Sequence, residues 1–225
     1  MPQIYYIYIL YFAALYLSCF LTGCLLVRKS RPLEYKLLVV LSGLTLVVET
    51  VVTQYDLRRI DGRWMYIFFA PVECGFIIYI LYRASVHPNI KRLNAILLGL
   101  LPISIGIAYW LHPAFSGFND IADFFYDFLE LIAACSFLTD VLLNKSDTPV
   151  GRQPLFWMAS GILFYCCMFT LLGVLLNYMP RMPRRYLAPY SLVANTFMYT
   201  GFIACFICLH RARRRNVAAS PYHIH

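Results

Sequence analysis

The chain has 225 residues, of which 61% are hydrophobic and only 13% charged. Soluble domains carry about 25% charged residues, so this composition excludes an ordinary soluble domain and is typical of a protein embedded in lipid. The formal net charge of +8 could indicate nucleic-acid binding. However, most lysines and arginines flank hydrophobic stretches, where they orient the chain and meet anionic lipid. We therefore expect the lipid bilayer as a partner and no nucleic acid.

Seven hydrophobic stretches occupy almost the whole sequence. A helix that crosses a bilayer needs about 20 mainly apolar residues, and only a helix satisfies all of its backbone polar groups inside lipid. In chain order, the stretches are residues 4–27, 36–55, 64–82, 93–111, 120–143, 154–178 and 187–210. They predict an all-α polytopic membrane protein. We expect one seven-helix transmembrane domain over residues 1–225, with a short basic cytoplasmic tail at 211–225.

The lysines and arginines divide unevenly between the alternating loops. Thirteen lie on one side of the predicted membrane: Arg28, Lys29, Arg31, Lys36, Arg83, Lys91, Arg92, Lys145, Arg152, Arg211, Arg213, Arg214 and Arg215. Six lie on the other: Arg58, Arg59, Arg63, Arg181, Arg184 and Arg185. Because the richer side stays in the cytoplasm, we expect the N-terminus outside and the C-terminus inside. The expected location is the inner (plasma) membrane of a cell, as a multi-pass protein.

The acidic residues inside the predicted spans include five that we single out: Glu49, Glu73, Asp123, Asp127 and Glu130. A charge at the bilayer centre costs a few kcal/mol, so such side chains face the bundle or water. Asp120, Asp123, Asp127 and Glu130 are spaced i, i+3, i+7, i+10, which places them on one face of a helix. The expected orientation puts all five acids in the outer half or the middle of the membrane.

We infer from this an outward-opening polar cavity with acids on its wall. Asn195 and Asn177 belong to the outer halves of the last two spans, and the six outer arginines surround the same mouth. The candidate ligand-binding residues are Glu49, Glu73, Asp123, Asp127, Glu130 and Asn195. Pro71 strengthens the interpretation near Glu73, because it leaves the carbonyl of Ile67 without its helical donor. Three interpretations remain open: fastening of helices, binding of a ligand or ion, and proton-linked transport or chemistry.

Signals for catalysis and cofactors are weak. The five histidines lie outside the deep parts of the spans, and no H-E-x-x-H, G-x-S-x-G or Walker pattern occurs. All eight cysteines fall in predicted spans, which favours small buried apolar residues over a disulfide framework. We therefore expect no catalytic residue, no metal site and no cofactor, and an enzyme is the less favoured class.

A further pattern of residues extends over nearly the full chain. Its most specific part is Pro154-Leu155-Phe156-Trp157, followed by Gly161 and Tyr165. The other members are Glu49, Tyr55, Tyr66, Glu73, Phe118, Asn119 and Glu130. Together they resemble a family of small seven-span bacterial membrane proteins that has no established activity. In that family a Gly-Asn pair follows the tyrosine, whereas Cys166-Cys167 follows here, so no role of that asparagine carries over.

The resemblance and the layout together indicate a function. The family is similar in layout to the seven-span sensor regions fused to histidine kinases. We expect the protein to sense or bind a small ligand in the outward cavity. It would act with a partner in the membrane or at the cytoplasmic face. The alternative is a proton-linked transporter or an intramembrane enzyme that uses its buried carboxylates.

Overall fold

A computed structural model describes residues 3–27, 31–58, 60, 62, 64–111, 120–144, 149–178 and 188–218. This part of the chain forms seven α-helices and one short 3-10 helix, which confirms the all-α prediction. The elements are α1 (Gln3–Leu26), α2 (Leu33–Leu57), α3 (Trp64–Ala84), α4 (Pro88–Leu111), α5 (Asp120–Leu143), η1 (Val150–Arg152), α6 (Pro154–Tyr178) and α7 (Ala188–Ala218).

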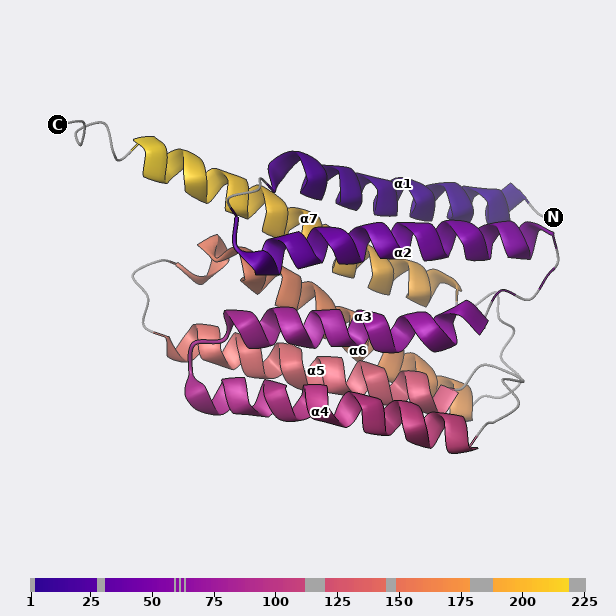
Figure 1. Ribbon diagram of the computed structural model, residues 1–225. Helices are drawn as coiled ribbons and strands as arrows, with labels where there is room; N and C mark the ends of the chain where they lie inside the picture. Colours follow the sequence, from indigo (N-terminus) through magenta and orange to yellow (C-terminus); the bar gives the residue numbers. More distant parts are fainter. Residues whose placement is uncertain are drawn as a thin grey trace.

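The helices run up and down beside one another in a single bundle (Figure 1). Six of the helices form a ring of neighbours. Helix α1 packs between α2 and α7, and helix α6 packs between α7 and α5. Helix α3 completes the ring because it packs on both α2 and α5. The remaining helix, α4, packs on α3 and α5 at the periphery. The connections place the starts of α2, α4 and α6 at one end of the bundle (Figure 1), which we call the basic end because Arg83, Lys91, Arg92 and Arg152 lie there.

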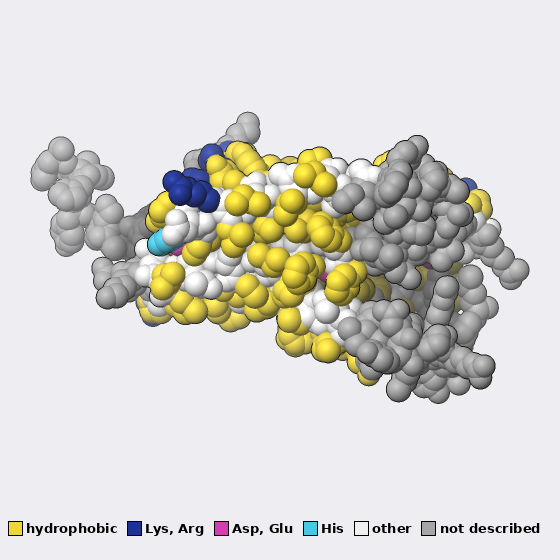
Figure 2. All heavy atoms as spheres, turned by 90° about the horizontal axis from the view of Figure 1, so that it is seen from below, with side chains coloured by type: hydrophobic (Ala, Val, Ile, Leu, Met, Phe, Trp, Pro, Cys, Tyr) yellow, Lys and Arg dark blue, Asp and Glu magenta, His cyan; other side chains and the backbone are white. Residues whose placement is uncertain are grey.

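Five of the described helices are long and apolar enough to cross a membrane: α1, α2, α3, α6 and α7. Large apolar side chains stay exposed along the bundle, among them Leu10, Val47, Phe68, Ile96 and Leu171. Figure 2 shows such side chains over the part of one face that is not drawn in grey, with several basic side chains near one end. A surface of this kind fits lipid rather than water, so the chain is a membrane-embedded helical protein.

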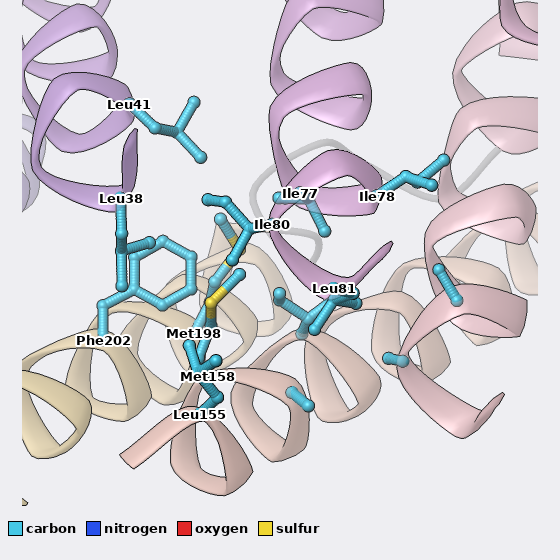
Figure 3. Close-up of a cluster of buried hydrophobic side chains, with 14 of the residues drawn as sticks. Leu38, Leu41, Ile77, Ile78, Ile80, Leu81, Leu155, Met158, Met198 and Phe202 are labelled. Atoms are coloured by element: carbon cyan, nitrogen blue, oxygen red, sulfur yellow. The ribbon is translucent and has the colours of Figure 1, made fainter. Parts of the chain in front are cut away.

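The apolar core contains buried side chains from all seven helices. Figure 3 shows part of it, in which Leu38, Ile77, Leu81, Met158 and Phe202 come from α2, α3, α6 and α7. These side chains are almost fully buried. They pack these helices together within the bundle.

The contact between α6 and α7 is unusually close because two glycines meet in it. A Cβ atom on Gly201 would lie 2.7 Å from the carbonyl oxygen of Trp157 and 3.1 Å from the Cα of Gly161. A Cβ atom on Gly161 would lie 3.1 Å from the carbonyl oxygen of Met198. Small residues of this kind let helix backbones approach one another in membranes. The crossing brings Tyr165 of α6 and Tyr199 of α7 to the same level of the bundle.

Several helices extend past the predicted spans, among them α2, which covers Leu33–Leu57 against the predicted 36–55. Helix α4 begins at Pro88 rather than near residue 93, because proline is well suited to a first helical turn. Helix α7 continues beyond residue 210 to Ala218, so the part of the predicted tail at 211–218 is helical. Helix α3 runs through Pro71 and helix α4 through Pro102.

Candidate functional site

Glu49 of α2 is held by a tyrosine from the neighbouring helix. The hydroxyl of Tyr66 in α3 donates a hydrogen bond to Oε1 of Glu49 at 3.0 Å. Both side chains are partly buried. A hydrogen bond to a carboxylate is stronger than one between neutral groups, so this contact fixes the carboxyl at the α2–α3 contact.

Glu130 of α5 is more deeply buried and lies beside a thiol. Its side chain is only 5% exposed. The Sγ atom of Cys166 in α6 donates to Oε2 of Glu130 at 3.9 Å, while the Cys74 thiol of α3 donates to the backbone carbonyl oxygen of Tyr126 at 3.7 Å. Cysteine is a weak donor, so the Glu130 carboxyl is less well compensated than that of Glu49.

Glu73 of α3 lies between these two carboxyls. It is within Coulombic reach of Glu49 and Asp127, and Glu130 interacts with both Glu73 and Asp127. Glu73 keeps part of its surface accessible, unlike Glu130. It therefore connects the carboxyl of α2 to the two carboxyls of α5.

Four tyrosines surround these carboxyls. Tyr199 interacts electrostatically with Glu73 and Glu49, and Tyr165 interacts with Glu73, Asp127 and Glu130. The ring of Tyr16 in α1 meets that of Tyr199 edge to face, with centroids 4.6 Å apart. We name the following set the central cluster: Glu49, Glu73, Asp127 and Glu130 with Tyr16, Tyr66, Tyr165 and Tyr199. Its members come from every helix except α4.

The central cluster contains acids without any basic residue at the same depth. The sequence has no lysine or arginine at positions 37–57, 64–82, 93–144, 153–180 or 186–210. Carboxylates in a low-dielectric interior repel one another strongly. Bound protons or a bound cation would neutralise the negative charge of Glu49, Glu73 and Glu130. Either form of neutralisation makes the cluster a candidate binding site rather than a set of ordinary packing residues.

The structure thus brings four of the six predicted site residues together: Glu49, Glu73, Asp127 and Glu130. Asn195 is instead bonded within its own helix, where its amide donates to the carbonyl oxygen of Ser191 at 2.9 Å and to the Ser191 hydroxyl at 3.3 Å. The side chains of Asp123 and Asn177 lie outside the described residues. So do the predicted cavity mouth at 112–119 and 179–187 and all outer arginines except Arg58.

Several members of the central cluster were not predicted from the sequence. Tyr16 and Tyr199 are two among 18 tyrosines, and an aromatic belt at the membrane surface accounts for many such residues. The sequence feature that distinguishes these two tyrosines is that both lie in the middle of a predicted span, whereas the tyrosines of an aromatic belt lie at its ends.

The sequence predicts that the cysteines are small buried apolar residues. Cys19, Cys74, Cys166 and Cys205 are buried, whereas Cys24, Cys135 and Cys167 are exposed on the surface of the bundle. The Cys166 thiol also donates to Glu130.

A second polar network lies near the basic end and was also missed. Asp140 of α5 is 3% exposed, and its two oxygens accept hydrogen bonds from the backbone N–H groups of Val86 at 2.7 Å and His87 at 3.0 Å. Asn94 of α4 donates to the Ser85 hydroxyl at 3.2 Å and accepts from Ser136 at 3.1 Å. The carboxylate satisfies free donors just before α4. Because its polar groups find partners inside the protein, this network attaches α4 to the bundle.

Away from the central cluster, a salt bridge near the basic end joins Glu34 to Arg83 at 3.3 Å. Within the ranges that the structure describes, no three histidine, cysteine or acidic side chains are arranged to hold a metal ion. Comparisons of the chain with protein-family models, with curated proteins and with solved structures found no match.

Proposed function

We propose that the chain is a seven-span receptor, with the N-terminus outside and the C-terminus in the cytoplasm, that binds a small cationic ligand at the central cluster. The observation that carries the proposal is the gathering of three glutamates from three helices, Glu49, Glu73 and Glu130, in stretches of the sequence that contain no lysine or arginine. A bound cation would supply the missing positive charge, and it would be favoured because the low dielectric strengthens its attraction to carboxylates.

The tyrosines suggest which cation would fit. Aromatic faces attract organic ammonium ions through the ring quadrupole, and several rings around one acid are a recurrent design for such ligands. Tyr16, Tyr165 and Tyr199 come from three helices and lie near enough to Glu73 to interact with it electrostatically. A primary or quaternary amine therefore suits the site better than a bare metal ion, which would need several oxygen ligands.

A partner completes the proposed receptor. The resemblance of the sequence to small seven-span bacterial proteins, and of their layout to kinase-linked sensor regions, supports a role in signalling. We propose that the partner lies in the membrane or at the cytoplasmic face of a bacterial inner membrane. The ligand would enter from the outer side, toward which the sequence predicts a cavity.

Thermal unfolding of the purified protein tests the binding site. Tetramethylammonium, ethylammonium and sodium chlorides at equal ionic strength provide the probes. A ligand that binds only the folded state stabilises it by about 2.7 kcal/mol at a hundred times its Kd, so an organic ammonium ion should raise Tm more than sodium does. Glu73→Gln should remove that difference while leaving the fold intact.

Glu34→Gln is the matched control, since it removes an acid that lies outside the central cluster and pairs with Arg83. It should keep the full response to ammonium ions. If every Glu→Gln variant in the cluster lowers Tm and the unmodified protein responds to none of the cations, the cluster fastens helices and the proposal is wrong. Proton flux into liposomes that Glu73→Gln abolishes would instead assign the cluster to proton-linked transport.

A further inference from the structure

The turn between α3 and α4 is held in place by buried polar side chains. The two carboxylate oxygens of Asp140, which is 3% exposed, accept hydrogen bonds from the backbone N–H groups of Val86 at 2.7 Å and His87 at 3.0 Å. The buried amide of Asn94 donates to the hydroxyl of Ser85, the first residue of the turn, at 3.2 Å. Hydrogen bonds shielded from water are strong, so the end of α3 and the start of α4 keep a fixed relation to each other.

Three exposed basic side chains flank this turn. Arg83 belongs to the last turn of α3, and Lys91 and Arg92 belong to the first turns of α4. The Nε of Arg83 donates to Oε1 of Glu34 at 3.3 Å. The ammonium of Lys91 lies 5.3 Å from the centre of the Tyr82 ring, which attracts a cation without carrying a charge. Among the described residues, Lys91 and Arg92 form no salt bridge, so this surface stays positive.

The exposed surface of α4 changes from basic to apolar within about one turn. Arg92, Ile96 and Ile103 are spaced i, i+4, i+11, which places them on one face of the helix. Ile96 is 59% exposed and Ile103 is 57% exposed. Figure 2 shows several basic side chains beside apolar ones near one end of the visible face. The cations therefore lie at the level expected for lipid phosphates, and the isoleucines lie at the level of acyl chains.

Helix α3 has the same arrangement beside α4. Tyr79, one turn before Arg83, is exposed, and its ring stacks on that of Tyr82 with centroids 6.2 Å apart. Tyrosine is enriched where a membrane meets water. The two neighbouring helices thus place this boundary at the same end of the bundle.

We propose that Lys91 and Arg92, together with Arg83, bind the phosphate of an anionic phospholipid whose acyl chains lie along Ile96 and Ile103. Ammonium and guanidinium groups donate strong hydrogen bonds to phosphate oxygens. A soluble phosphate would use the cations alone and leave the isoleucines uncovered, whereas a phospholipid uses both parts of the surface. This α3–α4 lipid site is separate from the central cluster and does not depend on the function of that cluster.

Native mass spectrometry of the full chain in detergent tests the site. Dioleoyl phosphatidylglycerol and dioleoyl phosphatidylcholine are the probes, because they share their acyl chains and differ in net charge. We expect phosphatidylglycerol to bind more tightly. The attraction of one basic side chain to anionic lipid corresponds to roughly fivefold in affinity. Lys91→Gln and Arg92→Gln should therefore each weaken phosphatidylglycerol binding about fivefold and leave phosphatidylcholine binding unchanged.

Arg58→Gln is the matched control, since it removes an exposed positive charge at the opposite end of the bundle. It should keep the full preference for phosphatidylglycerol. Equal binding of the two lipids by the unmodified chain would overturn the proposal, and so would a loss in Arg58→Gln as large as that in Arg92→Gln. Glycerol 3-phosphate, which lacks acyl chains, is the last probe. If it displaces phosphatidylglycerol at equal concentration, the surface binds phosphate alone and the assignment to a lipid is wrong.

Discussion

Tyr66 and Glu49 form a hydrogen bond of 3.0 Å between α3 and α2. The bond holds the carboxyl of Glu49 in a fixed position. Glu73 lies two turns further along α3, between Glu49 and the acids of α5. Because Tyr66 and Glu73 belong to the same helix, any shift of α3 changes both the held carboxyl and the central one. The cluster therefore responds as a unit.

Removal of this hydrogen bond should cost stability. Tyr66→Phe keeps the ring but leaves the Glu49 carboxyl without its donor, and an unsatisfied buried polar group costs about 1–3 kcal/mol. We expect the free energy of unfolding, measured by SDS titration in mixed micelles, to fall by that amount. Tyr79→Phe on the same helix is the control, since Tyr79 is exposed. Equal losses in both variants would contradict a specific role for Tyr66.

Asp140 should be a purely structural acid. In Asp140→Asn, an amide N–H₂ group replaces one of the two oxygens that accept from Val86 and His87. One backbone donor then loses its acceptor, and we expect the free energy of unfolding to fall by about 1–3 kcal/mol. The binding of ammonium ions should be unchanged. Gln54→Ala, at an exposed position of α2, should stay within about 0.5 kcal/mol of the original protein.

The orientation of the chain gives a third prediction. Thirteen lysines and arginines against six favour a cytoplasmic basic end. In intact cells, a membrane-impermeant maleimide should label Ser116→Cys and leave Ser146→Cys protected. The chain without an added cysteine provides the background from its native thiols. Labelling of Ser146→Cys with protection of Ser116→Cys would reverse the topology.

The sequence predicted the helices well because a bilayer leaves few choices. Stretches of about 20 apolar residues form helices in lipid, and the breaks between them are marked by prolines, glycines and charges. The ends were less predictable. Helix α7 continues past residue 210 because the segment His210–Arg215 contains no proline or glycine that would end a helix. The change from apolar to basic residues at this point indicates where the membrane ends, and it does not indicate where the helix ends.

The site was only partly predictable, because a sequence does not show how each helix is rotated about its axis and therefore which side chains face the centre of the bundle. The rarity of intramembrane acids was enough to choose Glu49, Glu73, Asp127 and Glu130. It could not show that Tyr16 and Tyr199 face them, since tyrosine is common throughout the chain. It also could not separate Asp140, which caps a neighbouring helix, from Glu130, ten positions earlier in the same helix. Those distinctions depend on which helices are neighbours, and a single sequence does not specify neighbour order.

The last prediction concerns the coupling between Glu73 and Glu130. The two carboxyls interact across α3 and α5, and no basic residue lies at their depth. Neutralising either one relieves the same repulsion, so the effects of Glu73→Gln and Glu130→Gln on the free energy of unfolding should not add. Contacting residues typically show interaction energies of about 0.5–3 kcal/mol in a double-mutant cycle, and we expect a value in that range.

A second cycle provides the control. Asp140 lies ten residues beyond Glu130, about 15 Å along α5, and belongs to the separate polar network at the basic end. The effects of Glu73→Gln and Asp140→Asn should therefore add to within about 0.5 kcal/mol. If the Glu73–Glu130 cycle is equally additive, the two carboxyls titrate and pack independently, and a single central site that includes both of them cannot be correct.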